Sequence, residues 1–259
     1  MRDIHVPEPL RAFFRENPRL ALAFSGGCDS AYLFYAAAAC GADVAAYYVR
    51  SPFQPAFELE DARRLAAELG RELRLIEVDA LADPRVRANP PERCYYCKQG
   101  IFGAILSAAA ADGYILVIDG TNASDDASDR PGMRALRELE VRSPLRECGI
   151  TKAQVRELSR GAGLFTWNKP AYACLATRIP TGAAIEAEAL QKVERAEAAL
   201  CALGFSDLRV RVTSGGCRLE LTGADMARLM ERRGEVLEAL QRDFPEITLN
   251  LRARKGLEV

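Results

Sequence analysis

A short glycine-rich segment, Ser25-Gly-Gly-Cys-Asp-Ser30, carries residue types that bind phosphate. Its two adjacent glycines let the backbone turn tightly and direct N–H groups toward an anion. An apolar run typical of a strand precedes it, and a predicted helix follows, whose N-terminus adds positive partial charge. Asp29 could cap that helix or help to hold Mg²⁺. The segment therefore predicts a nucleotide-phosphate site, with an ordinary glycine-rich turn as the alternative. The candidate ATP-binding residues in it are Ser25, Gly26, Gly27, Asp29 and Ser30.

A second polar segment, Asp119-Gly-Thr-Asn122, follows a later apolar strand. Ligands of open α/β sheets bind at the carboxyl ends of strands, so we expect this segment to lie beside the glycine-rich turn. Gly120, Thr121 and Asn122 are therefore further ATP-binding candidates. Neither segment has the Gly-Lys-Ser/Thr ending of a Walker loop or the spaced glycines of a dinucleotide-binding fold. Three acids that follow could bind a metal ion or form a solvated loop: Asp125, Asp126 and Asp129.

Cysteine provides the candidate nucleophile. Cys174 lies in a stretch without clear periodicity, residues 161–183, and a connection of this length inside a compact protein is usually functional or disordered. Lys169 and Arg178 flank Cys174 in sequence and could lower the pKa of its thiol, which favours the reactive thiolate. We therefore predict a catalytic role for Cys174; the alternative is a buried structural cysteine.

A second pair of cysteines, Cys94 and Cys97, precedes a predicted helix. Their spacing fits a redox pair, half of a zinc site or part of an iron–sulfur cluster. A zinc site needs about four ligands, and the sequence has no second close pair. Together with Cys174 the pair gives three thiolates, which fits a four-iron cluster with one open iron. The alternative is that both cysteines only pack.

The elements that would position these residues alternate along the first part of the chain. Apolar runs predict strands over residues 20–24, 44–49, 73–78 and 114–118, with a short further strand at 139–141. Helices are predicted over residues 30–40, 57–69 and 95–111, and a capping box at Thr151–Gln154 begins another that runs to about Arg160. Fully apolar strands interleaved with helices predict a parallel α/β sheet covered on both faces.

The pattern changes near residue 180. A charged helix is predicted over 185–203, a hairpin with strands 207–213 and 217–222, a helix over 224–242 and a strand over 247–251. These elements indicate a small α+β domain, so we expect domains at 1–180 and 181–259. Arg209 and Arg211 alternate on one strand and point to one face, which suits phosphate recognition. The alternative for these residues is an exposed, salt-bridged sheet face.

Composition limits the function classes. The chain has 259 residues, with 35 basic and 36 acidic side chains and a formal charge of −1, whereas a general nucleic-acid binder is usually far more basic. The near-neutral charge therefore argues against a nucleic-acid partner. No apolar run is long enough to span a bilayer, and the N-terminus lacks the apolar core of an export signal. These features predict a cytoplasmic protein without a membrane partner. His5, the single histidine, lies at the extreme N-terminus, which argues against histidine general-base chemistry.

The Ser-Gly-Gly-x-Asp-Ser pattern resembles the PP-loop of ATP pyrophosphatases, an adenine nucleotide alpha hydrolase-like, Rossmann-like fold. That family uses ATP and Mg²⁺, releases pyrophosphate and adenylates an acceptor. Three further segments narrow the resemblance to the LarE-type sulfur transferases of nickel-pincer nucleotide biosynthesis. These segments are Arg93-Cys-Tyr-Tyr-Cys-Lys98, Asp119–Asn122 with the later Arg130-Pro-Gly132, and Asn168-Lys-Pro-Ala-Tyr-Ala-Cys-Leu-Ala-Thr-Arg-Ile-Pro180.

The resemblance implies a reaction and site roles. ATP adenylates a carboxylate of pyridinium biscarboxylic acid mononucleotide, Cys174 forms a thioester, and its carbon–sulfur bond then breaks. Sulfur would come from sacrifice of Cys174 or through a [4Fe-4S] cluster on Cys94, Cys97 and Cys174. Arg178 would bind a substrate phosphate or carboxylate.

The small domain would hold the substrate phosphate at Arg209 and Arg211, and a metal ion at Glu197 and Glu220. The resemblance also implies a homo-oligomer, a hexamer or smaller ring. Other functions remain open: an amide-forming ligase similar to NAD synthetase, a tRNA thiolation enzyme, and a nucleotide-binding module without catalysis.

Overall fold

The computed structural model describes residues 6–125 and 130–254. Within them the chain forms two compact units. The first contains the chain up to Ser51 together with Ala56–Ala80 and Glu92–Lys169, and the second contains Pro52–Pro55, Leu81–Pro91 and the chain from Pro170 onward. The division therefore falls at Pro170, ahead of the expected boundary near residue 180, and two short earlier stretches join the second unit.

Backbone hydrogen bonds explain why these stretches belong to the second unit. The amide of Leu175 donates to the carbonyl of Phe53 at 2.9 Å, and that of Ile185 donates to the carbonyl of Arg87 at 2.8 Å. The side chain of Asn89 donates to the carbonyl of Pro180 at 2.8 Å. Such pairings between distant segments leave no local sequence signal.

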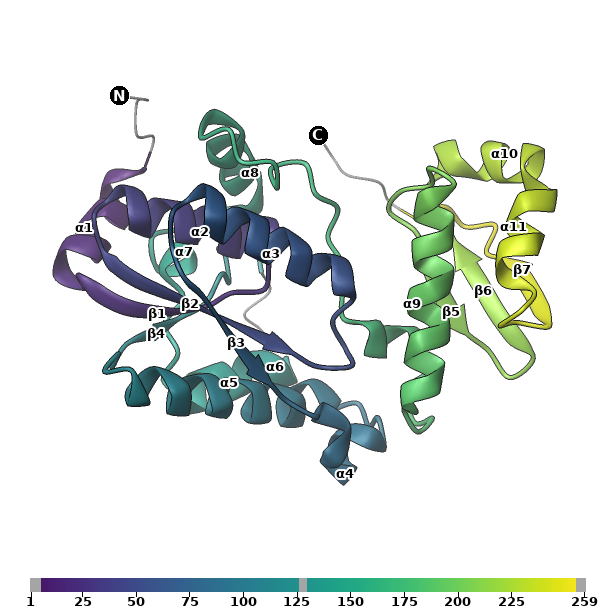
Figure 1. The fold of residues 1–259 in the computed structure, drawn as a ribbon, viewed down its shortest axis with the longest axis horizontal. Coiled ribbons are helices and arrows are strands. Elements are labelled where there is room, and N and C mark those ends of the chain that lie inside the picture. Colours follow the sequence, from purple (N-terminus) through teal and green to yellow (C-terminus); the bar gives the residue numbers. More distant parts are fainter. Residues whose placement is uncertain (1–5, 126–129, 255–259) are drawn as a thin grey trace. The chain divides into compact units, whose positions relative to one another are not determined.

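The first unit is built on a four-stranded sheet (Figure 1). Its strands are β1 (Arg19–Ala23), β2 (Asp43–Arg50), β3 (Leu73–Glu77) and β4 (Val117–Ile118), in the order β3-β2-β1-β4. All three pairings are parallel. The predicted parallel α/β fold is therefore confirmed.

Helices cover both faces of this sheet (Figure 1). One face packs against α1 (Glu8–Glu16), α2 (Cys28–Ala39), α3 (Ala56–Glu68), α7 (Pro144–Glu147) and α8 (Lys152–Gly161). The other packs against α5 (Arg93–Ala111) and α6 (Pro131–Glu138). Successive β1 residues alternate between the two cores, since Leu20 and Leu22 face the first and Ala21 the second. Two layers of helices therefore bury the sheet.

Two sequence expectations differ in this unit. The fourth strand is only two residues long, and the strand predicted at 139–141 is wrong, because those residues form no strand and only Arg142, directly after them, makes a single bridge with Ile118. Leu139 instead ends α6, a helix that was not predicted, and Glu140 has a left-handed φ of 53°. The capping box of Thr151 and Gln154 at the start of α8 is confirmed.

The second unit contains a three-stranded sheet and three main helices (Figure 1). Its elements are η1 (Ala80–Ala82, whose first residue belongs to the first unit), α4 (Pro84–Arg87), η2 (Leu175–Arg178), α9 (Ala187–Ala202), β5 (Arg209–Val212), β6 (Gly216–Glu220), α10 (Gly223–Glu231), α11 (Arg233–Leu240) and β7 (Glu246–Leu249). The predicted hairpin is confirmed, since β5 and β6 are antiparallel, and β7 pairs parallel to β6. The single helix expected over 224–242 is interrupted at Arg232, which leaves helical geometry at φ −102° and ψ 19°.

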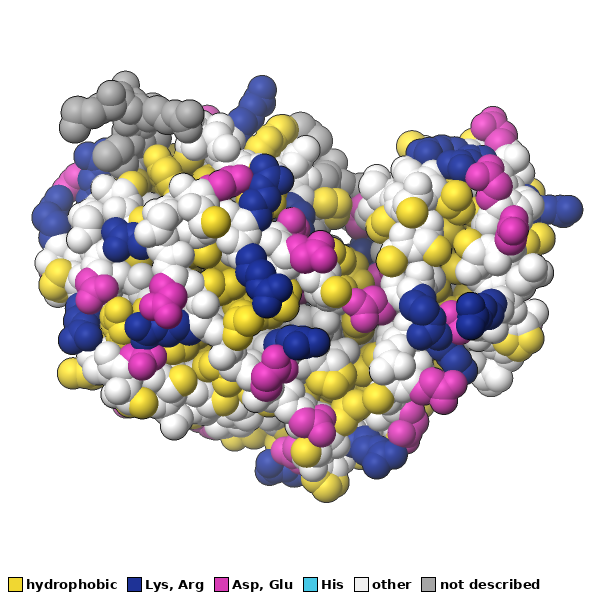
Figure 2. All heavy atoms as spheres, viewed as in Figure 1, with side chains coloured by type: hydrophobic (Ala, Val, Ile, Leu, Met, Phe, Trp, Pro, Cys, Tyr) yellow, Lys and Arg dark blue, Asp and Glu magenta, His cyan; other side chains and the backbone are white. Residues whose placement is uncertain are grey.

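Charged side chains are distributed evenly over the visible face. Basic and acidic side chains alternate there without a large patch of one sign (Figure 2), in keeping with the formal charge of −1. None of the helices in the described ranges combines the length and apolar character needed to cross a lipid bilayer.

Candidate active site

The glycine-rich turn between β1 and α2 is a compact loop held by its own serines. The hydroxyls of Ser25 and Ser30 lie 3.1 Å apart, and the backbone amide of Gly27 donates to Ser25 Oγ at 3.4 Å. Gly26 has a left-handed φ of 73°, and a Cβ there would lie 2.9 Å from the carbonyl oxygen of Glu58. Glycine is therefore required at this position, and the turn presents the N-terminus of α2 as an anion site.

The second predicted segment does lie against this loop. A Cβ on Gly120 would be 2.8 Å from the backbone nitrogen of Ser30 and 3.1 Å from its Cα. Only glycine permits so close an approach of the two segments. Asp119 accepts hydrogen bonds from the hydroxyls of Thr121, at 2.6 Å, and Ser143, at 2.7 Å. The carboxylate thus fixes the loop that carries the nucleotide-binding candidates.

Asp29 is linked to both neighbouring segments. Its carboxylate accepts from the side-chain amide of Asn122 at 3.3 Å and forms an ion pair with Lys152. It does not cap α2, whose N-cap residue is Gly27 and which has no side-chain cap. Of the two predicted roles, the helix cap is therefore wrong, and the role in holding Mg²⁺ stays a prediction. Lys152 is a functional candidate missed in the sequence, where it was only part of a capping box.

The acids after Asn122 divide into described and undescribed residues. Asp125 Oδ2 accepts from the backbone amide of Asn122 at 2.8 Å, which makes it part of a turn. Asp126 and Asp129, the other two acids of this predicted loop, lie outside the described residues.

Lys169 does not have the predicted relation to Cys174. Its ammonium pairs with Asp61 at 2.6 Å and donates to the carbonyl oxygen of Gly26 at 3.2 Å, both within the first unit. The charge of Lys169 is therefore engaged at the glycine-rich turn, residues 25–30, which we call the phosphate loop. The prediction relied on the sequence proximity of Lys169 to Cys174, but the long Lys169 side chain reaches Asp61 and Gly26 in the first unit.

Cys174 belongs to the second unit, where it is half-buried directly before η2. Its carbonyl oxygen accepts from the amide of Thr177 at 3.0 Å and from its hydroxyl at 2.8 Å. Arg178 donates to the carbonyl of Ala173 at 2.8 Å. The backbone around the thiol is therefore held by hydrogen bonds.

Arg178 holds this turn from a buried position, which is a correction to its expected role as a substrate ligand. Its side chain is 0% exposed, and its guanidinium pairs with Glu197 through Nε at 2.8 Å and Nη2 at 3.1 Å. The same carboxylate accepts from the hydroxyl of Tyr172 and from the amide of Val210. Arg178 is thus a positioning residue, and the protein already fills the ligand positions of Glu197.

Arg209 is also turned inward. Its guanidinium donates to the carbonyls of Leu208 and Ala171 and lies over the ring of Tyr172, 5.1 Å from its centroid. Burial, reinforced by the charge of Arg178, lowers the pKa of Arg209 to about 10. In this structure Arg209 holds the backbone ahead of Cys174, a different role from the predicted contact with a substrate phosphate.

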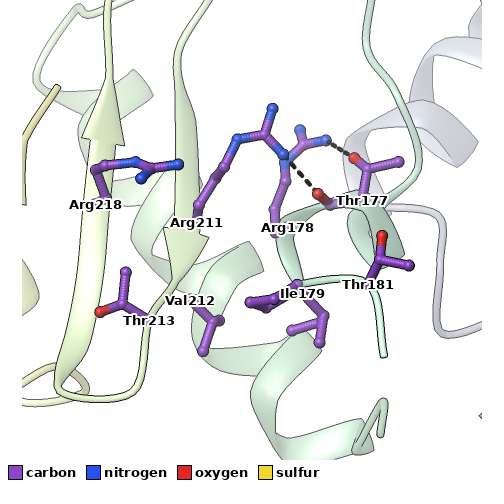
Figure 3. A pocket seen from close by; sticks show the side chains of 9 residues that line it. Thr177, Arg178, Ile179, Thr181, Arg211, Val212, Thr213 and Arg218 are labelled. Atoms are coloured by element: carbon purple, nitrogen blue, oxygen red, sulfur yellow. Dashed lines mark hydrogen bonds between the residues drawn. The ribbon is translucent and has the colours of Figure 1, made fainter. Parts of the chain in front are cut away.

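Arg211 lies at a pocket of about 460 Å³ within the second unit (Figure 3). It is directly opposite Arg218 on the neighbouring strand, an arrangement in which like charges destabilise a sheet. Glu220 accepts from Arg211 at 2.7 Å and contacts Arg218 at 3.5 Å. Arg254 also contacts Glu220, at 3.8 Å, so three guanidiniums share one carboxylate and a surplus of positive charge remains. Glu220 is thereby engaged by arginines in place of the predicted metal ion.

Cys94 and Cys97 lie in the first turns of α5, where the sequence had placed them before a helix. Cys94 is exposed, and its sulfur lies 3.5 Å from Arg93 Nη2. The pair belongs to the first unit and Cys174 to the second. Over the ranges that the structure describes, no group of three or more His, Cys, Asp or Glu side chains is placed to bind a metal ion. Neither unit by itself therefore supplies three cluster ligands.

Comparison with known proteins shows some likenesses that cover nearly the whole chain and others that cover only part of it. An uncharacterized protein of Synechocystis sp. is 39% identical over 248 residues, which cover 94% of this chain and 92% of that protein. The pyridinium-3,5-bisthiocarboxylic acid mononucleotide synthase of Lactiplantibacillus plantarum is 33% identical over 245 residues, 93% of this chain and 89% of the synthase. A tRNA-specific 2-thiouridylase of Clostridium botulinum is 28% identical over 182 residues, 58% of this chain and 52% of the thiouridylase. No protein-family model matches the chain.

Proposed function

Because this chain belongs to the LarE-type family of ATP-dependent sulfur transferases, we propose that it converts a carboxylate of pyridinium biscarboxylic acid mononucleotide into a thiocarboxylate. The observation that carries the proposal is the short chain distance between the two reactive segments. Lys169 contacts the phosphate loop, and Cys174 follows five residues later. An extended chain of that length spans at most about 18 Å. This short tether supports the proposal, because it limits how far the thiol can move from a nucleotide bound in the loop.

The proposed reaction has three steps without net oxidation or reduction. A substrate carboxylate oxygen attacks the α-phosphorus of ATP, and pyrophosphate leaves. The thiolate of Cys174 then attacks the acyl carbon, and AMP leaves with the bonding electrons, which gives a thioester. Removal of the Cα proton of Cys174 finally forms a Cα–Cβ double bond and breaks the Cβ–Sγ bond. The sulfur departs with the acyl group as a thiocarboxylate, and dehydroalanine remains in the protein.

The phosphate loop would bind ATP in this reaction. The proposed ligands are the loop residues and the segment packed against them: Ser25, Gly26, Gly27, Ser30, Gly120, Thr121 and Asn122. Mg²⁺ bound to nucleotide phosphates needs only one or two protein carboxylates, which Asp29 fits. The ion would replace Lys152 as the partner of Asp29 and leave that ammonium for a phosphate. No catalytic base is needed for adenylation, because a carboxylate is already ionised at neutral pH.

The arginine-lined pocket would bind the phosphate of the mononucleotide. Arg211 and Arg218 supply the surplus positive charge, and the bidentate geometry of guanidinium suits phosphate oxygens. Arg209 contributes from the same strand by holding the backbone at Ala171. A nucleotide phosphate would compete with Glu220 for the half-buried guanidinium of Arg211 and the exposed one of Arg218.

The sulfur route is proposed as sacrifice of Cys174. The alternative cluster route would need Cys94, Cys97 and Cys174 as joint ligands of a [4Fe-4S] group, and these residues are divided between the two units. No step above passes through a cluster. A homo-oligomeric assembly and a cytoplasmic location also remain predictions.

Intact mass spectrometry after incubation with ATP, Mg²⁺ and the mononucleotide tests the proposal. We expect pyrophosphate, a thiocarboxylate product and loss of the elements of hydrogen sulfide at residue 174. Cys174→Ala should still release pyrophosphate but form no thiocarboxylate, whereas Cys201→Ala, at an exposed site of the same unit, should behave as the wild type.

Three results would each contradict sulfur delivery by sacrifice. Thiocarboxylate formation by Cys174→Ala would remove the cysteine from the reaction. Ammonia-dependent amide formation by the same variant would identify an amide-forming ligase. A brown, anaerobically purified protein that turns over with Cys174 intact would identify the cluster route.

A further inference from the structure

Lys169 occupies a position that the sulfur-transfer chemistry above does not use. Its ammonium has three N–H donors, and among the described residues its partners are Asp61 and the carbonyl of Gly26. It also lies 5.2 Å from the ring centroid of Phe57. The Lys169 side chain is only 15% exposed, so its charge is directed at the phosphate loop and away from bulk water.

The backbone of Lys169 is fixed as firmly as its side chain. Arg156, on α8, donates from Nη1 to the carbonyl of Trp167 at 2.8 Å and from Nη2 to that of Lys169 at 2.9 Å. The amide of Lys169 donates to the carbonyl of Thr166 at 3.1 Å. Lys169 is therefore a preorganised cation at the phosphate loop, anchored at both ends to the first unit.

The second unit takes hold of the chain two residues later. Arg209 donates to the carbonyl of Ala171, and the hydroxyl of Tyr172 donates to Glu197. Only Pro170 separates the last anchored residue of the first unit from the first anchored residue of the second. A short link of chain, anchored on both sides, therefore joins Lys169 to the segment that carries Cys174.

We propose that Lys169 binds the nucleotide phosphates in the loop and thereby positions the Cys174 segment for attack on the acyl adenylate. The inference rests on the proposed function and adds a residue to it. An anion bound in the loop would lie near the ammonium of Lys169, where the neutral carbonyl of Gly26 now accepts its hydrogen bond. A charged hydrogen bond is stronger than one to a neutral carbonyl, so the phosphate would replace the carbonyl of Gly26 as a partner of Lys169 and, because it carries several negative charges, would compete with Asp61.

Binding of α,β-methylene-ATP with Mg²⁺, measured by calorimetry on the full chain, separates this role from a structural ion pair. Lys169→Met should weaken binding about 10- to 100-fold, the worth of one charged hydrogen bond. Lys169→Arg should recover most of the loss. Asp61→Asn should leave binding unchanged or tighter, because it removes a competing carboxylate. A purely structural pair predicts that both neutral variants lose affinity equally, which would overturn the proposal.

The positioning role has its own readout at saturating ATP. In Lys169→Met, loss of sulfur from Cys174 should slow about tenfold relative to pyrophosphate release. Lys192→Met, at a half-buried lysine paired with exposed Glu188 in the second unit, is the matched control and should change neither quantity. Unchanged nucleotide affinity in Lys169→Met, or an unchanged ratio of the two rates, overturns the proposal. Failure of the wild type to lose sulfur from Cys174 would instead refute the proposed function.

Discussion

Removal of one partner of the buried pair Arg178 and Glu197 should be among the most destabilising single charge changes in the second unit. Both side chains are almost fully removed from water, at 0% and 5% exposure. Arg178→Met would leave the Glu197 carboxylate with only the Tyr172 hydroxyl and the Val210 amide as donors. It would also release the carbonyl of Ala173, next to the reactive cysteine.

The magnitude follows from the burial. Breaking a buried ion pair by removing one partner costs about 3–5 kcal/mol, because the remaining charge stays desolvated and uncompensated. Glu197→Gln should also destabilise, since it leaves the guanidinium without its counter-charge. The double variant Arg178→Met/Glu197→Gln removes both charges, so its cost should fall below the sum of the single costs by about 2 kcal/mol.

Urea unfolding followed by far-ultraviolet circular dichroism measures these differences, provided that the slope of free energy against urea stays constant. The surface pair of Arg195 and Asp243 is the control, because the Arg195 side chain is 56% exposed and Arg195→Met should cost less than about 1 kcal/mol. If Arg178→Met costs no more than this control and the double variant is additive, the buried-pair reasoning is wrong.

Two further predictions test the phosphate loop and the cysteines. Gly120→Ala would place a methyl group 2.8 Å from the Ser30 amide nitrogen and should weaken ATP binding about tenfold or more. Gly100→Ala, in open space on α5, is the control and should leave the affinity for ATP unchanged. Equal affinities of the two variants in a calorimetric titration would contradict the close approach. Burial raises the pKa of Cys217 to about 11, so its thiolate is scarce near neutral pH. Iodoacetamide should therefore label exposed Cys94 at least about a hundredfold faster than Cys217, and Cys217 should gain reactivity as the pH rises toward its pKa. Equal labelling of the two cysteines in a mass-spectrometric time course would refute this prediction.

Local patterns predicted most of the first unit. The glycine-rich turn, the capping box at Thr151 and the apolar strands β1 and β2 are each set by neighbouring residues, and all of them are present. The approach of Gly120 to the loop also followed from a general rule about strand ends. These features were predictable because each depends on a few consecutive residues.

Features that depend on long side chains or distant partners were not predictable. Lys152 and Lys169 reach the phosphate loop from segments more than a hundred residues further along the chain. The resemblance implied that Arg178 binds substrate, but Arg178 is buried against Glu197, and this contact exists only once α9 has packed against η2. The break at Arg232 is followed by Gly234, but an isolated glycine inside a helical pattern is tolerated, so the periodicity joined the two helices that flank the break. In each case tertiary contacts decided the outcome.

The interleaving of the two units bears on how the protein is made and how it can be cut. Residues 52–55 and 81–91 leave the ribosome well before their partners in 170–259 are synthesised. The carbonyls of Phe53 and Arg87 can therefore accept their hydrogen bonds only after Leu175 and Ile185 have been added to the chain. A fragment that begins at residue 170 would lack those acceptors and the α4 turn. The C-terminal region is therefore not a transplantable module, and recombination between relatives should preserve both early stretches together with it.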